Sequence, residues 1–266
     1  MLRSKQETKG LEEMKKRETA LLELLAEHGR MEVSALAEKL ETSQVTIRKD
    51  LDALEKRGII RREHGFAVFG GTDDLNNRLA IHYEEKRKIA RAAARTVSPG
   101  ETVMIENGSC CALFAEELAA INPDVTIITN SAFIASYIRR SGNVHIVLLG
   151  GDFQKDAQVM VGPILRVCAA QFYVDKLFIG VDGYSEALGF TGKDHLRVQA
   201  VRDMAEHADG VYVITESSKF SRHGVVPISL PEGKLLHVIT DTLLPEEKER
   251  TLRQAGVKVT KAEETE

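Results

Sequence analysis

The stretch "TSQVTIRKDLDALEKRGIIRREHGFAVFGG", residues 42–71, joins an amphipathic segment to a short basic segment that ends in glycines. Ile47, Leu51 and Leu54 lie at i, i+4 and i+7, a spacing that predicts a helix with one buried stripe. The basic segment, "RGIIRREHGFAV", predicts two short strands with a turn at Gly65 between them. The stretch therefore predicts a helix followed by a β wing.

Two further helices are expected before this one. The first covers residues 12–27 and ends at Gly29, and the second, "VSALAEKL", buries Val33, Leu36 and Leu40. Three helices, the last with a polar and basic N-terminal half, followed by a wing, suit insertion into the DNA major groove. The prediction is a winged helix-turn-helix. A solvated helix of mixed charge is the alternative for the third helix taken alone.

Polar side chains on the third helix and the wing are the candidates for DNA contact. Uncharged side chains can reach base edges, and Arg or Lys can hold phosphates. The candidate DNA-binding residues are Ser43, Gln44, Thr46, Arg48, Lys49, Arg61, Arg62 and His64.

Composition predicts a globular protein. The 266 residues are 43% hydrophobic and 29% charged, and no apolar run reaches the roughly 18 residues of a membrane span. The charged N-terminus lacks the apolar core of a signal peptide, and the three cysteines lack metal-ligand spacing, so a cytoplasmic protein without metal or cofactor is expected. The net charge of −4 excludes a generally cationic protein but is compatible with a local basic face.

A different pattern begins near residue 101. Short apolar runs ("TVMIEN", "VTIITN", "VHIVLLGG", "DKLFIGVDG", "GVYVITES", "LLHVITD") alternate with helical stretches, which predicts strands buried on both faces and βαβ units. The expected fold class is α/β, with a mainly parallel, doubly wound sheet after the winged helix-turn-helix. The expected boundaries are residues 1–71 for the DNA-binding domain, 72–100 for a linker and connecting helix, 101–260 for a sensing domain and 261–266 for a frayed tail.

Polar and glycine-rich residues follow five of the predicted strands. The carboxyl ends of parallel strands converge on one edge, where backbone N–H groups at helix starts favour an anion. We therefore expect a small polar or phosphorylated ligand there, and the alternative is that these segments are tight structural turns. The candidate residues are Glu106, Asn107, Gly108, Ser109, Cys110, Asn130, Ser131, Gly150, Gly151, Asp182, Gly183 and Lys219.

The order of these motifs is similar to that of DeoR-type bacterial transcriptional regulators. Their signature T-I-R-R-D-L, then R-R-x-H-G-G-A, resembles "TIRKDL" and "RREHGFA", and their I-T-N-S, L-L-G-G, V-G-P, D-K-x-F-x-G-x-x-G and D-S-S-K-F resemble "ITNS", "LLGG", "VGP", "DKLFIGVDG" and "ESSKF". The likeness covers about residues 12–260. It implies a DNA-binding domain joined to a sugar-phosphate sensor related to phosphosugar isomerases. It also adds Thr191, in "GFT", and Arg197 to the effector-binding candidates.

The sequence departs from this family pattern at several positions. Lys49 replaces the second Arg, which loses the bidentate fork, and Phe66 replaces the second Gly of the wing. In the sensor, Glu106 stands where Asp is usual, Cys110 and Cys111 where Thr is usual, Arg197 where Glu is usual and Val201 where Lys is usual. Since thiols are weak donors and Arg reverses a charge, we expect these departures to alter ligand choice.

The resemblance implies a transcriptional regulator, by family default a repressor, of carbohydrate metabolism genes. The expected partners are a double-stranded DNA operator, a phosphorylated sugar or related metabolite that modulates DNA affinity, and further copies of the chain in a dimer or tetramer. One alternative is a phosphosugar-processing enzyme with an appended DNA-binding module, although Glu106, Asp182 and Glu216 are not paired in sequence with a His or Lys that singles out a base. Another is a DNA-binding scaffold whose second domain only oligomerises.

Overall fold

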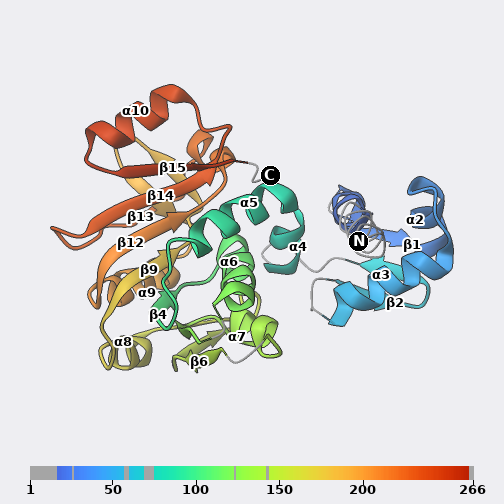
Figure 1. Cartoon of the computed structure of the whole chain (residues 1–266), viewed down its shortest axis with the longest axis horizontal. Coiled ribbons are helices and arrows are strands. Elements are labelled where there is room, and N and C mark those ends of the chain that lie inside the picture. The colour runs from blue at the N-terminus through green and yellow to red at the C-terminus, as the bar shows by residue number, and fades with distance from the viewer. Residues whose placement is uncertain are drawn as a thin grey trace, which may run out of the picture. The chain divides into compact units, whose positions relative to one another are not determined.

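The chain forms two compact units, residues 1–84 and 85–266, in a computed structural model (Figure 1). The structure describes residues 17–25, 27–56, 60–68, 75–122, 124–141 and 144–263. Parts of the predicted first helix, third helix, wing, linker and tail lie outside the described residues, namely residues 12–16, 57–59, 69–74 and 264–266.

The first unit contains the predicted helices. A first helix covers residues 17–25 and 27–28, and Gly29 ends it with a φ of 69°, in the left-handed region that favours glycine. The following elements are β1 (Arg30–Glu32), α2 (Val33–Lys39), α3 (Gln44–Lys56), β2 (Arg61–Glu63), β3 (Phe66–Val68), α4 (Leu75–Ala80) and α5 (Tyr83–Ala94), the last of which continues into the second unit.

The buried stripe predicted on α3 is confirmed. Ile47, Leu51 and Leu54 are each 0% exposed. From α2, Leu36 is fully buried as predicted, but Leu40 is only half-buried, because α2 ends there. The two helices pack through these apolar faces, which leaves the opposite side of α3 in solvent.

The wing has one strand more than predicted. β2 and β3 form the expected antiparallel pair around the turn at His64 and Gly65, whose φ angles are 33° and 85°. β1 pairs with the other side of β3, so the sheet order is β1-β3-β2. A strand of three residues has no visible period in sequence, which is why β1 was not predicted.

The second unit is built on a sheet of seven parallel strands. Their order is β15-β14-β12-β9-β4-β5-β6, with β15 and β6 at opposite edges in Figure 1. The first strand of this sheet, β4, lies inside it, with later strands added on both sides, which is the doubly wound arrangement. The strands are β4 (Thr102–Ile105), β5 (Thr126–Thr129), β6 (His145–Leu148), β9 (Val174–Ile179), β12 (Ala208–Ile214), β14 (Leu235–Asp241) and β15 (Lys258–Ala262).

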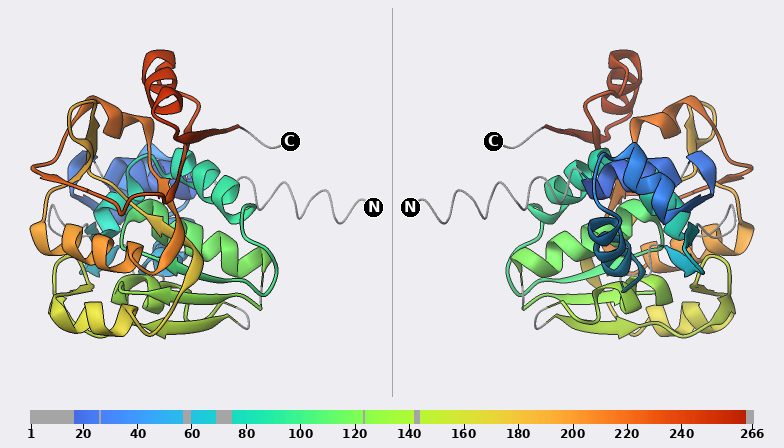
Figure 2. Two further views of the ribbon diagram at one scale, coloured as in Figure 1. Left: turned by 90° about the vertical axis from the view of Figure 1, so that its left-hand side faces the viewer. Right: turned by 90° about the vertical axis from the view of Figure 1, so that its right-hand side faces the viewer.

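Two smaller antiparallel sheets and several helices complete this unit. The small sheets are the hairpin β7 (Asp152–Gln154) with β8 (Val159–Val161), and β10 (Gly183–Ser185) with β11 (Gly189–Gly192) and β13 (Val226–Pro227). The helices are α6 (Ser109–Ile121), α7 (Ala132–Ile138), α8 (Pro163–Ala169), α9 (His195–Ala205), η1 (Ser217–Ser221) and α10 (Glu246–Gln254). Both views of Figure 2 show α10 at the edge of the unit where β15 lies.

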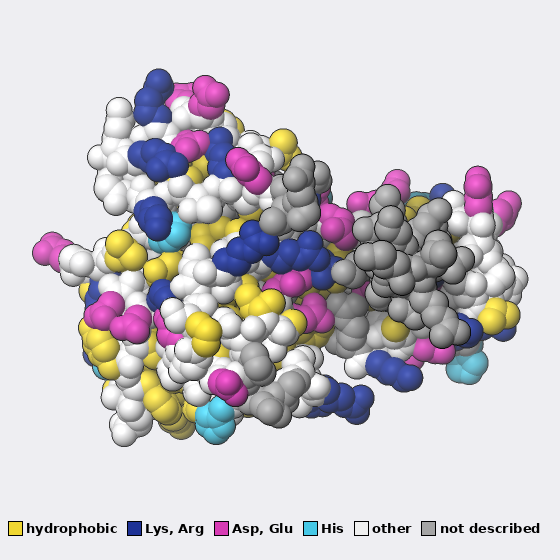
Figure 3. All heavy atoms as spheres, viewed as in Figure 1, with side chains coloured by type: hydrophobic (Ala, Val, Ile, Leu, Met, Phe, Trp, Pro, Cys, Tyr) yellow, Lys and Arg dark blue, Asp and Glu magenta, His cyan; other side chains and the backbone are white. Residues whose placement is uncertain are grey.

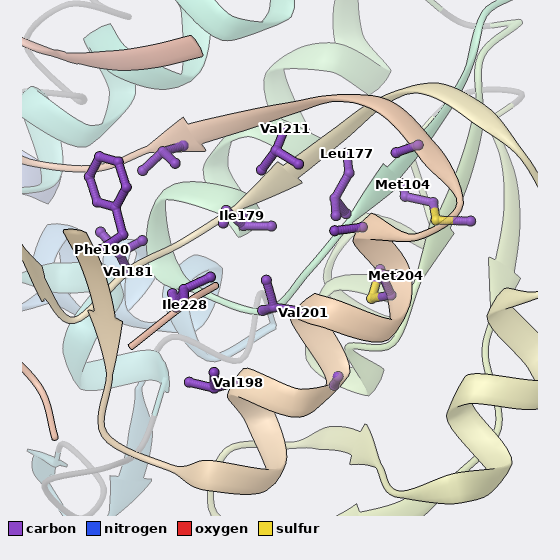
Figure 4. Close-up of a cluster of buried hydrophobic side chains, with 14 of the residues drawn as sticks. Met104, Leu177, Ile179, Val181, Phe190, Val198, Val201, Met204, Val211 and Ile228 are labelled. Atoms are coloured by element: carbon purple, nitrogen blue, oxygen red, sulfur yellow. The ribbon is translucent and has the colours of Figure 1, made fainter. Parts of the chain in front are cut away.

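Helices cover both faces of the large sheet. On β9, Leu177 and Ile179 join the apolar cluster that includes Val201 of α9 (Figure 4). Phe178 points to the other face, where its ring centroid lies 4.2 Å from that of Phe114 on α6. This explains the continuous apolar runs of the central strands.

Two expectations about strands need correction. β6 was predicted to be buried on both faces, but it is an edge strand, and His145 and Leu148 are exposed. The last strand, β15, continues to Ala262, so Lys261 and Ala262 are in the sheet rather than in a frayed tail.

A row of rings crosses the sheet on the α6 side. The ring centroid of Phe178 lies 4.8 Å from that of Tyr212, which lies 5.1 Å from that of His237. The imidazole Nε2 of His237 is 2.9 Å from Thr260 Oγ1 on β15. Burial, together with the nearby charge of Lys258, lowers the pKa of His237 to about 4. The ring is therefore neutral at physiological pH.

This lowered pKa predicts a pH dependence of stability. Below the unfolded pKa of 6.5 the unfolded chain binds a proton before the folded chain does, so stability is lost as pH falls from 6.5 towards about 4. Between about pH 7 and about pH 5, the melting temperature of the wild type should fall further than that of His237→Gln, which can still bond Thr260. The exposed His145→Gln variant is the control and should follow the wild type. If the melting temperatures of the wild type and His237→Gln fell equally over this pH range, the result would contradict this account.

Candidate functional site

The exposed side of α3 forms the first candidate site. Gln44, Arg48 and Lys49 are exposed, and the Arg48 guanidinium donates to Gln44 Oε1 at 3.4 Å. Ser43 caps the helix, because its Oγ accepts the Thr46 N–H at 3.1 Å and lies 2.9 Å from Thr46 Oγ1. The candidates on α3 thus divide into three exposed side chains and a pair that fixes the start of the helix.

Val45 is an exposed apolar residue on this side that was not among the predicted contacts. It is 60% exposed, between Gln44 and Thr46. An aliphatic side chain at the start of a recognition helix can contact the methyl group of thymine. Its position outside the stripe of Ile47, Leu51 and Leu54 could have shown from sequence that it faces solvent.

The wing residues differ in their availability. Arg61 and His64 are exposed. Arg62 is half-buried, its guanidinium pairs with Asp52 on α3, and its N–H donates to Glu55 Oε1 at 3.0 Å. Arg62 therefore fastens the wing to α3.

The unusual Phe66 has a packing role in the same sheet. The Arg30 guanidinium lies 4.0 Å from the centroid of the Phe66 ring, a cation–π contact between the paired strands β1 and β3.

The second candidate site lies at the carboxyl ends of β4 and β9. The strand order reverses direction between these strands, which is where open α/β sheets bind ligands. Residues 106–109 leave β4 there, and a Cβ on Gly180, just after β9, would lie 3.3 Å from the carbonyl oxygen of Asn107. Gly108 has a φ of 146°, which other residues rarely adopt. The loop therefore depends on glycine for its conformation and for its close approach to β9.

The start of α6 in this loop differs from the starts of α7 and α9. Ser131 and Asp194 cap α7 and α9 with their own side chains. α6 has Gly108 as its N-cap and α8 has Gly162, and a glycine has no side chain to offer. The first turn of α6 contains Ser109, Cys110 and Cys111, all buried. A helix start of this kind, with the positive end of the helix dipole, suits an anion.

Asn107 links the loop to the neighbouring strand end and to the hairpin. Its Oδ1 accepts the Ser131 hydroxyl at 2.9 Å, and its Nδ2 donates to the carbonyl of Ala157 at 3.2 Å. Asn130 makes a matching contact, because its Nδ2 donates to the carbonyl of Met160 at 3.1 Å. These two amides, with Ser131, clamp the β7–β8 hairpin onto the ends of β4 and β5.

Gly150 and Gly151 lie between β6 and this hairpin. A Cβ on Gly151 would lie 2.6 Å from the carbonyl oxygen of Val161, and a Cβ on Gly150 would lie 3.6 Å from Cys168 Sγ. Gly151 therefore allows the chain after β6 to pack tightly against β8, whereas a Cβ on Gly150 would make only an ordinary van der Waals contact.

Asp182, Gly183 and Thr191 are brought together around β10 and β11. Asp182 Oδ2 accepts the Lys193 N–H at 2.9 Å, and Thr191 Oγ1 accepts the Gly224 N–H at 2.7 Å. A Cβ on Gly183 would come within 2.3 Å of the Arg222 carbonyl oxygen. The Thr191 and Gly183 contacts bind the small sheet to residues 222–224, and the Asp182 contact joins the segments before β10 and after β11.

Arg197 lies in the first turn of α9 beside its capping residue. Asp194 Oδ1 accepts the Arg197 N–H at 2.8 Å and the Gln154 amide of the hairpin at 3.2 Å. Burial opposes ionisation of Asp194, but these hydrogen bonds and the Arg197 charge outweigh it and hold the pKa of Asp194 below its usual value. The Arg197 region is thereby connected to the hairpin that Asn107 and Asn130 hold.

Lys219 lies in η1, next to a buried ion pair that was not predicted. Its N–H donates to the Glu216 carbonyl at 3.0 Å. Glu216 Oε2 lies 3.2 Å from Lys86 Nζ, and the two side chains are 8% and 2% exposed. Lys86 was missed because "HYEEKRKIARAAARTV" is rich in charges, and its sequence does not show which of them is buried.

The predicted effector candidates thus form connected groups rather than one ring of free side chains. Glu106, Asn107, Gly108, Ser109, Cys110, Asn130 and Ser131 gather at the ends of β4 and β5; Asp182, Gly183 and Thr191 lie around β10 and β11; Arg197 and Lys219 lie in α9 and η1. Within the described ranges, no group of three or more His, Cys, Asp or Glu side chains could hold a metal ion. Among those same residues, no helix is long and apolar enough to cross a membrane.

Comparison with known protein families matches both units. Residues 17–71 match the DeoR-like helix-turn-helix domain, and residues 81–242 match the DeoR C terminal sensor domain. A "Putative aga operon transcriptional repressor" of Escherichia coli O157:H7 is 28% identical over 91% of this chain and 92% of its own length. The "HTH-type transcriptional repressor GlcR" of Bacillus subtilis (strain 168) is 31% identical over 75% of this chain and 78% of its own length.

Among solved structures, a ribose 5-phosphate isomerase A from Methanocaldococcus jannaschii aligns with 52% of this chain and 55% of its own, at 19% identity and a TM-score of 0.40. The two sequence relatives are named as regulators of transcription, not as enzymes. With the helix-turn-helix domain at one end and the sensor domain over more than half of its length, the chain belongs to the DeoR family of DNA-binding transcriptional regulators.

Proposed function

We propose that the chain is a repressor of carbohydrate metabolism genes whose operator affinity is modulated by a phosphorylated sugar or related metabolite. The names of the similar aga operon repressor and GlcR repressor support repression, and the first supports control of an operon. The observation that carries the effector assignment is the glycine-capped start of α6 at the point where the strand order reverses.

In the proposed DNA complex, α3 enters the major groove. Gln44 and Val45 are exposed near the N-terminal end of α3, where a recognition helix contacts base edges. Arg48, Lys49, Arg61 and His64 hold phosphates. Since Arg62 already pairs with Asp52, its main role here is to keep the wing in place.

In the proposed effector complex, the phosphate lies at the start of α6. The backbone amides of the first turn and the helix dipole favour the anion, and the ammonium of Lys219 adds charge. The hydroxyl groups of the sugar meet the polar side chains of the same edge, among them Glu106 and Asn130. Cys110 and Cys111 supply little hydrogen bonding there, which favours recognition of the phosphate by backbone rather than by side-chain hydroxyls.

In this proposal the protein acts in the cytoplasm as an assembly of at least two copies. One winged helix-turn-helix covers only a half-site, and specific binding normally needs two half-sites about one helical turn or a multiple apart. A homodimer satisfies this requirement, and a tetramer satisfies it twice.

The first DNA prediction concerns phosphate contact. Arg48→Ala should weaken binding to operator DNA, obtained by selection from a random pool, and reduce the slope of log K against log salt by about one, because one phosphate contact is lost. The exposed Arg139→Ala, in the second unit, is the matched control and should leave the slope unchanged. An unchanged affinity and slope for Arg48→Ala would overturn this placement of α3.

The second DNA prediction concerns base contact by Val45. If Val45 meets a thymine methyl group, replacing that thymine by uracil should weaken wild-type binding by about 1 kcal/mol, whereas Val45→Ala should respond much less. Single thymine-to-uracil substitutions across the selected operator, measured with both proteins, locate the position. A wild type that is indifferent to every such substitution would exclude this contact.

Binding of the effector is tested by thermal shift. Wild-type protein is screened with glycerol phosphate, pentose and hexose phosphates, the corresponding free alcohols and sugars, and inorganic phosphate. A bound ligand raises the melting temperature by mass action. The most effective phosphorylated compound should then change operator affinity, and the absence of any stabilising phosphorylated compound would contradict the proposal.

Gly108→Ala should weaken binding of that compound by at least about tenfold, because a side chain disturbs the loop where backbone amides approach the anion. Gly256→Ala is the matched control, because Gly256 also has a positive φ of 79° but lies after α10, with no atom within 4 Å of a Cβ there. Lys219→Ala should weaken binding of the same compound without abolishing operator binding. Wild-type affinity for the compound in both Gly108→Ala and Lys219→Ala would remove the phosphate from this edge.

A further inference from the structure

α5 carries charged side chains with partners on several other elements. Glu84 Oε1 accepts the hydroxyl of Thr19, on the first helix, at 2.8 Å. Arg87 donates to Glu117 Oε1 of α6 at 2.7 Å, and Arg91 Nε lies 3.4 Å from the same oxygen. Figure 3 shows Lys and Arg side chains in a row over α5, with acidic side chains beside them. The helix is thus held by directed polar contacts.

The most deeply buried of these contacts is the pair Lys86–Glu216. The two side chains are 2% and 8% exposed, with 3.2 Å between Nζ and Oε2. Breaking a buried ion pair by removing one member is generally destabilising, whereas replacing both members can be neutral for stability. Glu216 is therefore one of the contacts on which the position of α5 depends.

Glu216 belongs to the loop at the carboxyl end of β12. Its Oε1 accepts the Ser218 hydroxyl at 3.2 Å, and its carbonyl accepts the Lys219 N–H at 3.0 Å. The next residue, Ser217, donates its N–H to Asp241 Oδ2 at the end of β14, at 2.7 Å. A change at Lys219 or at the end of β14 consequently reaches Glu216 through short hydrogen bonds.

α6 provides a second connection from the proposed effector site to α5. It begins at the Gly108 loop, and Glu117 on the same helix holds Arg87 and Arg91. α5 is therefore tied to both loops that would hold the anion. The division between the two compact units falls within α5, after Glu84, and Glu84 makes its contact inside the first unit.

We propose that α5 transmits the state of the sensor to the DNA-binding unit, with the Lys86–Glu216 pair as the contact that changes. This inference rests on the proposed function. When Lys219 turns towards an anion, the bond from its N–H to the Glu216 carbonyl moves residue 216, and with it the carboxylate that contacts Lys86. Because α5 is a continuous helix, a displacement at Lys86 is felt at Glu84, two residues away, and at its bond to Thr19.

The test compares operator affinity with and without the phosphorylated compound that gives the largest wild-type thermal shift. In wild type the two dissociation constants should differ by about fivefold or more, the usual range for coupled sites. In the double variant Lys86→Met/Glu216→Gln this ratio should fall to about one, while affinity for the compound stays within about threefold of wild type. The double variant replaces both charges of the pair together, and the amide oxygen that Glu216→Gln introduces can still accept the Ser218 hydroxyl.

The matched control is Lys176→Met/Glu101→Gln. This pair is also a partly buried Lys–Glu contact of the second unit, with 2.8 Å between the charged atoms and exposures of 18% and 10%, but it lies at the amino ends of β9 and β4. It should keep the wild-type ratio. Thr19→Val, which loses the hydroxyl that bonds Glu84, should lower the ratio without changing affinity for the compound.

The proposal would be overturned if Lys86→Met/Glu216→Gln kept the wild-type ratio of operator dissociation constants with and without the compound. It would also be overturned if the control pair Lys176→Met/Glu101→Gln lost that ratio equally. Loss of compound binding in Lys86→Met/Glu216→Gln would also overturn it, because the pair would then hold the site rather than transmit its state. A wild type that binds no phosphorylated compound, or whose operator affinity ignores the one it binds, would instead contradict the proposed function itself.

Discussion

The parallel arrangement of the large sheet is the constraint on which the rest of the second unit depends. Since all seven strands run in one direction, their carboxyl ends share one edge, and the polar residues that leave the strands are brought together there. Asn107, Asn130 and Ser131 hold the β7–β8 hairpin, and Asp182 and Thr191 make their hydrogen bonds around β10 and β11. The edge consequently carries separate groups of hydrogen-bonded polar residues.

At this edge, α6 begins differently from α7 and α9; α8 also has a glycine N-cap, but α6 is the one that follows β4, next to the point where the strand order reverses. Side chains cap α7 and α9, but a glycine with a φ of 146° begins α6 where the strand order reverses. Glycine loses more conformational entropy on folding than other residues, but here it lies where the backbone passes close to another strand end. Such a position favours an anionic ligand, and the buried Lys86–Glu216 pair connects the same edge to the helix that continues into the first unit.

Sequence patterns predicted the features that are visible as regular spacing of apolar residues, as glycine positions or as alternation of strands and helices. The stripe of Ile47, Leu51 and Leu54, the glycine turns of the first unit and the parallel α/β sheet were all predicted, because apolar spacing and glycine placement record them directly. Short β1 and the edge position of β6 were not, since neither strand length nor edge position has a local signal. The pairing of Lys86 with Glu216 spans 130 residues (216 − 86), and only the fold brings the two together.

For the candidate sites too, the sequence indicated some features, and others depend on contacts made only in the fold. Residue type and order made Gln44, Arg48 and the Gly108 loop candidates, but did not show that Arg62 is engaged by Asp52 or that both polar groups of Asn107 are used within the protein. The most direct test of the account is amide hydrogen exchange of the wild type with and without the phosphorylated compound that stabilises it most. The account predicts increased protection in residues 106–111 and 216–221 and altered exchange in α5. Protection confined to other segments, or unchanged exchange in α5, would contradict it.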